Sequence, residues 1–395
     1  MSNDPFCYPN PSGKPDGERV LRNRFGITSG KELRQEEYRA TAFRIAEIRE
    51  GDGPKGKFDA DHLKAIHHHI FQDVYEWAGH TRAETPIVDG QRMPPIGSLS
   101  KAGTSFLPGQ KIDMGLADAF KELRDLKKLD GIRADDFAKM AGKVLGDLNY
   151  VHPFREGNGR TQETFIAELG RELGHDVQFD VVSKARMIEG SKEAIRDADS
   201  RALAHAVLDA VDTNRQGAIR AAFGMLREYG EDPMEHDVRT ALPGDRVAGH
   251  LVGHDELTIK IAAENFIVVA DRRDFSHKLE DEMEVDFVAT SDFSGHAKAR
   301  AYLEGSRTEL MNDPELRKAV SLENYVAEKT AKQYPNDKDA IDQAVTVARE
   351  KIAGMIANGI EIPSPTLQRN REIDRPSADS APPDSDRSSD HRRER

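Results

Sequence analysis

Three side chains of complementary chemistry lie in residues 152–160, which read His-Pro-Phe-Arg-Glu-Gly-Asn-Gly-Arg. His152 can accept a proton from an attacking hydroxyl at neutral pH, because the ordinary pKa of histidine is about 6.5. Glu156 offers a hard oxygen ligand for Mg²⁺, and Arg160 carries a permanent charge in a fork that fits phosphate oxygens. A base, a metal ligand and an arginine in one short string indicate phosphoryl or nucleotidyl transfer.

Two helices are expected to position this string. The first ends near Val151, as predicted by an apolar stripe at helical spacing: Phe137, Met140, Val144 and Leu148. Pro153 disfavours helical geometry at His152, so the histidine is placed at a helix end. The second helix begins near Arg160, and its stripe is Phe165, Ile166, Leu169 and Leu173. The glycines between the helices leave free N–H groups at a helix N-terminus, which is a phosphate cradle.

Each part of the string also has a simpler explanation. A lone His-Pro is usually a helix terminator, Gly-Asn-Gly is usually a turn, and Glu beside Arg is usually a solvated pair. Their joint occurrence favours chemistry. The Walker and Rossmann glycine patterns are not matched, and neither is the deaminase pattern, since paired cysteines are lacking.

The string resembles the signature of Fic-domain proteins, His-Pro-Phe-x-Asp/Glu-Gly-Asn-Gly-Arg-x-x-Arg. Residues 20–27 and 70–82 are similar to the family's leader and to the stretch before its flap, and the resemblance covers roughly residues 8–230. It implies a mainly α Fic fold with a short β-hairpin flap. It also implies transfer of AMP from ATP, with Mg²⁺, to a Tyr, Ser or Thr hydroxyl of a target protein, with release of pyrophosphate.

The resemblance also assigns roles to residues. His152 is the general base and Glu156 the metal ligand. The nucleotide-binding loop is expected to comprise Phe154 as its anchor, followed by Gly157, Asn158, Gly159, Arg160 and Thr161. An irregular excursion, residues 80–109, is rich in glycine and proline. Within it, residues 82–95 are the expected flap, which aligns the target by main-chain pairing through Thr85, Pro86, Ile87 and Val88.

One position departs from the signature. Glu163 stands where the pattern has a second arginine, and a carboxylate beside a phosphate is repulsive. Either Glu163 turns away to pair with a neighbour such as Arg160, or the donor is held mainly through its α and β phosphates. Transfer from another nucleotide or phosphate donor, and a catalytically weak adaptor linked to conjugation or secretion, remain as alternatives. No complete inhibitory motif Ser/Thr-x-x-x-Glu-Gly/Asn is found, so a separate small antitoxin is expected.

The chain is expected to hold several domains: a catalytic domain over 1–232, a small OB-like β-barrel over 238–292, a helical segment over 295–362 and a disordered tail over 363–395. The predicted strands are Arg246–Gly253, Glu256–Ala262, Asn265–Ala270 and Met283–Ala289. The helical segment, with two or three helices and stops at Pro335-Asn336 and near Gly359, resembles delivery regions of type IV secretion effectors and C-terminal regions of relaxases.

Composition excludes several classes of protein. The formal net charge of −13 argues against general nucleic-acid binding. A single cysteine, Cys7, excludes an internal disulfide and a cysteine-rich zinc site. No run approaches the roughly 18 apolar residues of a membrane span, and no signal sequence begins the chain. The bacterial cytoplasm is the expected place of synthesis, with translocation into another cell as a further step. His67-His68-His69 point around a helix, which disfavours a metal site.

Overall fold

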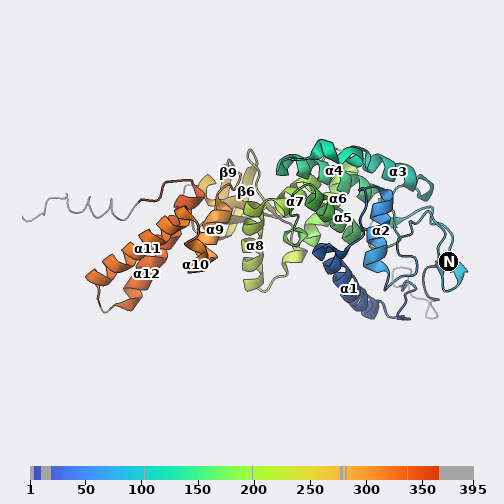
Figure 1. Cartoon of the computed structure of the whole chain (residues 1–395), viewed down its shortest axis with the longest axis horizontal. Helices are drawn as coiled ribbons and strands as arrows, with labels where there is room; N and C mark the ends of the chain where they lie inside the picture. Colours follow the sequence, from blue (N-terminus) through green and yellow to red (C-terminus); the bar gives the residue numbers. More distant parts are fainter. Residues whose placement is uncertain are drawn as a thin grey trace, which may run out of the picture. The chain divides into compact units, whose positions relative to one another are not determined.

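The computed structural model describes residues 4–9, 19–101, 103–197, 199–275, 279–280, 283–335 and 337–363. It divides into two compact units, Met1–Ser294 and Gly295–Arg395 (Figure 1). The expected tail, residues 363–395, lies outside the described residues from residue 364 onward.

The first unit is mainly helical, as predicted. Its helices are α1 Gly30–Glu47, α2 Ala60–Phe71, α3 Ile112–Ala119, α4 Ala134–Val151, α5 Asn158–Glu172, α6 Lys184–Arg196, α7 Ala202–Val211 and α8 Thr213–Glu228. A π-helical turn, Ile48–Asp52, follows α1, and 3-10 turns cover Gly109–Lys111, Lys121–Leu129, Phe179–Val181, Pro233–Glu235 and Arg272–Asp274. Several helices begin at a side-chain cap: Ser29 for α1, Asp59 for α2, Ser183 for α6 and Asp212 for α8.

Helix α4 is the centre of the helical core. It packs against α7 and α5, and α2 packs against α1 and α5 (Figure 1). The helices on either side of the 152–160 string therefore share one apolar interior. The predicted helix end at Val151 is confirmed, and α5 begins at Asn158, two residues before the predicted start.

The excursion between α2 and α3 forms two hairpins. The first pairs β1, Ile87–Val88, with β2, Gln91–Arg92, around a turn in which Asp89 and Gly90 have positive φ angles of 48° and 73°. Two consecutive positive φ angles are the geometry of a tight hairpin turn. This hairpin lies within residues 82–95, where a β-hairpin flap was expected, and is called the flap below. A second hairpin, β3 Ser100–Lys101 with β4 Thr104–Ser105, was not predicted.

A five-stranded sheet completes the first unit. Its strands are β5 Val238–Thr240, β6 Arg246–His254, β7 Thr258–Ala262, β8 Ile267–Asp271 and β9 Glu284–Val288, in the order β5-β8-β7-β6-β9. Among the described strands, only β5 and β8 pair in parallel. The four predicted strands are present and β5 was missed.

The expected closed OB-like barrel is wrong, because the described strands form an open sheet with no ladder between its edges β5 and β9. Strand β5 is tied to the helices instead. Arg186 of α6 donates to the Val238 carbonyl at 3.2 Å, and Asp209 of α7 accepts from the Thr240 N–H at 3.2 Å. Arg186 and Arg215 flank the buried Asp209, at 2.6 and 3.6 Å. The sheet edge is therefore bonded to the helices rather than to β9.

The second unit is helical. It contains α9 His296–Glu304, the single turn α10 Arg307–Leu310, α11 Pro314–Gln333 and α12 Lys338–Ala357. The described residues thus form four helices where two or three were expected, and α11 and α12 end at the predicted stops. None of the described helices has the length and apolar character needed to cross a membrane.

Candidate active site

His152 caps the C-terminus of α4 in a left-handed conformation. Its φ and ψ angles are 46° and 61°, and its N–H donates to the Leu148 carbonyl at 2.9 Å. A non-glycine residue in this region is uncommon and persists only when its surroundings hold it there. One such contact is Phe106, whose ring stacks on the imidazole with centroids 3.8 Å apart and planes 8° apart.

The environment of His152 keeps its ring neutral. Burial, together with the positive charges of Lys101 and Arg82, lowers the pKa of His152 to about 4, although Glu156 acts to raise it. A neutral imidazole at pH 7 is a proton acceptor. Its Nδ1 atom is buried and has no hydrogen-bond partner among the described residues.

The loop after His152 is closed by Asn158. The side chain of Asn158 accepts a hydrogen bond from the Phe154 N–H and donates to the Phe154 carbonyl, both at 2.9 Å. Phe154 is buried and stacks on His67 with centroids 3.8 Å apart. Both side chains therefore shape the loop from beneath, and Phe154 occupies the expected anchor position.

The N-terminus of α5 presents free amides. The first helical hydrogen bond runs from the Thr161 N–H to the Gly157 carbonyl, at 3.1 Å, so the amides of residues 158–160 have no acceptor within the helix. Gly157 has φ 83°, and a Cβ there would lie 2.2 Å from Phe71, so glycine is required. A Cβ on Gly159 would meet open space. Thr161 is buried, and its hydroxyl donates to the Gly157 carbonyl at 2.9 Å.

Glu156 is a carboxylate that lies directly before Gly157, the N-cap of α5. One carboxylate oxygen accepts from the Gly157 N–H at 3.1 Å, and its main-chain carbonyl lies 3.1 Å from Nε2 of His67. Within the described ranges, no cluster of three or more His, Cys, Asp or Glu residues is arranged to hold a metal ion. One carboxylate nevertheless fits Mg²⁺, which proteins commonly bind through one or two carboxylates while substrate phosphates and water complete its shell.

Arg160 is engaged by α1. Its guanidinium forms an ion pair with Glu37, donates to the Thr41 hydroxyl at 3.0 Å and lies 4.7 Å from the centroid of the Phe71 ring. Glu37 also accepts a hydrogen bond from the Tyr75 hydroxyl. Sequence reasoning missed Glu37, because a partner 123 positions away leaves no local pattern.

Glu163 lies one turn further along α5. Burial raises the pKa of Glu163 to about 7, although the charges of Arg160 and Arg49 act to lower it. Of the two arrangements considered from the sequence, pairing with Arg160 is not found among the described contacts, since Arg160 pairs with Glu37.

The flap presents alternating faces. Pro86 and Val88 are buried, whereas Thr85 and Ile87 are exposed, Ile87 by 50%. The flap tip is held by an ion pair between Arg22 and Asp89, at 2.6 Å, and by the Asp89 N–H, which donates to Glu76 at 2.6 Å. The stretches that resemble the family's leader and pre-flap segment therefore both contact the flap.

The three consecutive histidines, residues 67–69, make contacts with different groups. His67 accepts from the Gly79 N–H at 2.8 Å, His68 lies 3.0 Å from the Ala78 carbonyl, and His69 lies 3.0 Å from Glu47. The three rings thus face different groups, as the helical spacing predicted.

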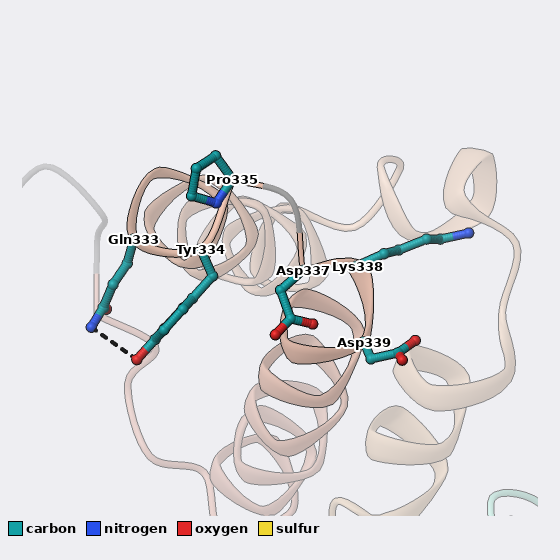
Figure 2. Close-up of a pocket in the computed structure, with 6 residues that line it drawn as sticks. All are labelled: Gln333, Tyr334, Pro335, Asp337, Lys338 and Asp339. Carbon is teal, nitrogen blue, oxygen red and sulfur yellow. Dashed lines mark hydrogen bonds between the residues drawn. The ribbon is translucent and has the colours of Figure 1, made fainter.

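A separate cavity lies in the second unit, at the turn between α11 and α12. Figure 2 shows its lining residues, among which Gln333 donates to the Tyr334 hydroxyl at 3.2 Å. It contains none of the predicted site residues, which all belong to the first unit.

The chain is similar in sequence to known proteins over the part that holds the site. Residues 57–169 match the sequence model of the Fic/DOC family. The chain is 35% identical over 193 residues to protein adenylyltransferase VbhT of Bartonella schoenbuchensis, an alignment that covers 49% of this chain and 36% of that protein. It is 35% identical over 187 residues to the probable protein adenylyltransferase y4lH of Sinorhizobium fredii, which covers 47% of this chain and 85% of that protein.

The solved structure of the type IV secretion system effector protein BepA matches with a TM-score of 0.64 and 24% identity, over 72% of this chain and 96% of that one. This likeness shows a shared fold. The chain matches less than half the length of VbhT, at 36%, and of a protein adenylyltransferase from Bartonella henselae, at 44%.

Proposed function

The chain belongs to the Fic/DOC family, and we propose that it is a protein adenylyltransferase that transfers AMP from ATP to a Tyr, Ser or Thr hydroxyl of a target protein. One observation carries the proposal: the neutral, stacked ring of His152 lies at the head of a loop that ends in the free amides of α5. A proton acceptor and an anion cradle on one rigid loop are what in-line transfer at phosphorus requires.

The proposed reaction is a single in-line displacement at the α-phosphorus. The target hydroxyl oxygen forms a bond to the α-phosphorus of ATP while Nε2 of His152 takes the hydroxyl proton. The bond from the α-phosphorus to the bridging oxygen breaks, and pyrophosphate leaves with that electron pair. Because the pKa of His152 is about 4, nearly all of the enzyme holds this ring neutral and ready to accept the proton at pH 7.

The phosphates are assigned to the start of α5. The amides of residues 158–160 and the positive end of the helix favour negative charge there. We assign Arg160 to the β-phosphate. To contact it, the Arg160 guanidinium would either leave Glu37 or contact Glu37 and the phosphate together. Glu156 would hold Mg²⁺, which supplies charge neutralisation between the phosphates when bound. Phe154, Asn158 and Thr161 support the loop through buried contacts.

The flap is assigned to target alignment. The exposed Ile87 and the two-residue strand β1 offer a short edge on which an extended target segment can pair. Thr85, Pro86 and Val88 fix this edge, since Thr85 accepts from Arg92 at 3.2 Å and the Pro86 carbonyl accepts from Met93 at 2.8 Å.

Transfer from another nucleotide or phosphate donor is the second candidate, and Glu163 favours it. A carboxylate where the family signature has an arginine weakens any hold on a γ-phosphate. Competition of ATP, GTP, CTP and UTP for binding, measured by calorimetry, separates the candidates. Preference for a nucleotide other than ATP favours the second.

The remaining parts are assigned to delivery and control. We propose that residues 1–232 are catalytic, 238–292 form a spacer sheet and 295–362 belong to a delivery region for type IV secretion from the bacterial cytoplasm. The order of helical catalytic part, sheet and helical unit supports this assignment. A separate small antitoxin is proposed because the inhibitory motif is incomplete. A reporter fused to the chain, with and without residues 295–395, measures translocation directly.

The transferase proposal is tested with ATP labelled at the α-phosphate. The full chain, incubated with lysate and Mg²⁺, should transfer label to protein, and His152→Ala should abolish transfer. His236→Ala, at a partly exposed histidine that contacts Glu231 outside the site, is the matched control and should retain transfer. Absence of transfer from every nucleotide tested would refute an enzymatic role.

A further inference from the structure

Arg82 is a buried cation without a counter-ion. Its residue is 2% exposed, and no carboxylate within the described part of the chain forms an ion pair with it. Burial of an unpaired charge is costly, and it lowers the pKa of this guanidinium. Such a group persists only where hydrogen bonds compensate it, so its partners indicate what it does.

The guanidinium donates to main-chain carbonyls on two segments. On the side of the motif, Nε donates to the His152 carbonyl at 2.8 Å and Nη2 to the Val151 carbonyl at 3.0 Å. On the side of the excursion, Nη1 lies 3.4 Å from the Ile96 carbonyl, and Nη2 donates to the Leu107 carbonyl.

The main chain strengthens the same junction. The Arg82 N–H donates to the Pro153 carbonyl at 2.8 Å, and the Arg82 carbonyl accepts from the Ile96 N–H at 2.7 Å. The Leu107 N–H donates to the Tyr150 carbonyl at 3.0 Å. One residue thus joins both ends of residues 96–107 to the end of α4.

The position also suits a cation. The last carbonyls of a helix lack helical donors and carry partial negative charge, so a cation at the C-terminus of α4 is favourable. Only arginine presents several donors in a fixed planar fork, whereas lysine offers a single ammonium group on a flexible stem. A positive charge alone would therefore suit this position whether it came from lysine or arginine. Only the guanidinium fork of arginine can donate to carbonyls of both segments at once.

We propose that Arg82 is a positioning residue that holds the excursion, with the flap and Phe106, in register with the main chain of His152. Phe106 lies directly before Leu107, and its ring stacks on the imidazole. The flap begins at Arg82 itself. The same fork therefore places the proton acceptor, the ring that stacks on it and the target-aligning strand. The role in turnover rests on the proposed transferase function.

The first test measures the clamp without catalysis. Hydrogen exchange of the full chain is compared for wild type and Arg82→Lys. Peptides covering residues 93–109 should exchange at least several-fold faster in the variant, while peptides from α7 and α8 remain unchanged. The control is Arg171→Lys, because Arg171 also donates to two carbonyls, those of Ile48 and Arg49, at 3.1 and 2.9 Å. Unchanged exchange over residues 93–109 would overturn the proposal.

The second test separates nucleotide binding from catalytic turnover. Arg82→Lys should bind Mg²⁺-ATP within about twofold of wild type, because the α5 amides are intact, yet lose roughly 10²-fold in kcat and raise KM for the target. Wild-type kinetics, or losses of nucleotide affinity and thermal stability that match the loss of kcat, would overturn the positioning role. Wild-type inactivity would instead count against the transferase proposal, and the exchange experiment would still decide the clamp.

A pH profile adds a readout that a general loss of structure does not give. The charges facing His152 are Arg82 and Lys101, which lower its pKa, and Glu156, which raises it. Arg82→Gln removes one positive charge, so its acid limb should move to higher pH than that of Arg82→Lys. Coincident acid limbs in these two variants would contradict an effect of the Arg82 charge on the imidazole.

Discussion

Replacing Glu163 by glutamine should stabilise the first unit above neutral pH and change it little near pH 5. The pKa of Glu163 is about 7 in the folded protein, against an ordinary value of 4.5. The folded protein thus binds this proton more tightly than the unfolded chain. Ionising this buried carboxyl lowers the free energy of unfolding. The loss is absent below pH 4.5, grows as the pH rises, and is complete above pH 7. The difference in pKa corresponds to about 3 kcal/mol, which partial exposure reduces to roughly 1–3 kcal/mol.

Urea unfolding at pH 5.0 and 8.5 measures this effect. Trp77 is the only tryptophan in the sequence and is buried in the helical core, so its fluorescence reports on the unit that contains Glu163. Glu163→Gln should raise the free energy of unfolding at pH 8.5 by roughly 1–3 kcal/mol and at pH 5.0 by less than about 1 kcal/mol. Glu172→Gln, at an exposed position on the same helix, is the control. An equal difference at both pH values would refute the reasoning.

Three further outcomes are expected. Transfer by wild type should persist to about pH 5, since the pKa of His152 is about 4, and an acid limb near pH 6.5 in the kcat profile would contradict this. Glu37→Gln should tighten ATP binding by up to about fivefold in calorimetry, because it frees the motif arginine, and weaker binding would show instead that Glu37 orients that arginine. Gly157→Ala should lower the free energy of unfolding by at least about 1–3 kcal/mol, because of the positive φ at this position and the clash with Phe71. Gly159→Ala should be tolerated in thermal melts, and equal losses of stability in the two variants would argue against this packing.

The local geometry of the site could be predicted because its causes are local. Pro153 and the first apolar stripe predicted where α4 ends, and the second stripe predicted α5 to within two residues of its observed start at Asn158. Period-two alternation likewise predicted the four longer strands of the sheet. Strand β5 was not predicted because it has only three residues, too few for a period to be visible. Its hydrogen bonds to side chains of the helices explain why the sheet stays open.

Contacts between distant segments could not be predicted in the same way. Within the described part of the chain, the Arg82 guanidinium donates only to main-chain carbonyls, and a carbonyl has no residue type that a sequence pattern can reveal. Glu37 is one of four acidic residues on α1, and nothing in its spacing singles it out as the partner of Arg160. The stacking of Phe106 on His152 depends on how the excursion returns to α4, which the Arg82 fork decides.

These distant contacts change how the phosphate end of the site is understood. The signature by itself suggests an arginine free to bind phosphate, but Glu37 already balances that charge, and Glu163 adds a second carboxylate nearby. The attraction that remains for a nucleotide comes from the amides of α5 and from the cation that Glu156 would hold. Both lie at the start of the helix, beside the loop that begins at His152. The proposed enzyme would therefore hold its donor through the phosphates nearest the reacting atom, and its grip on the distal phosphate would be weak.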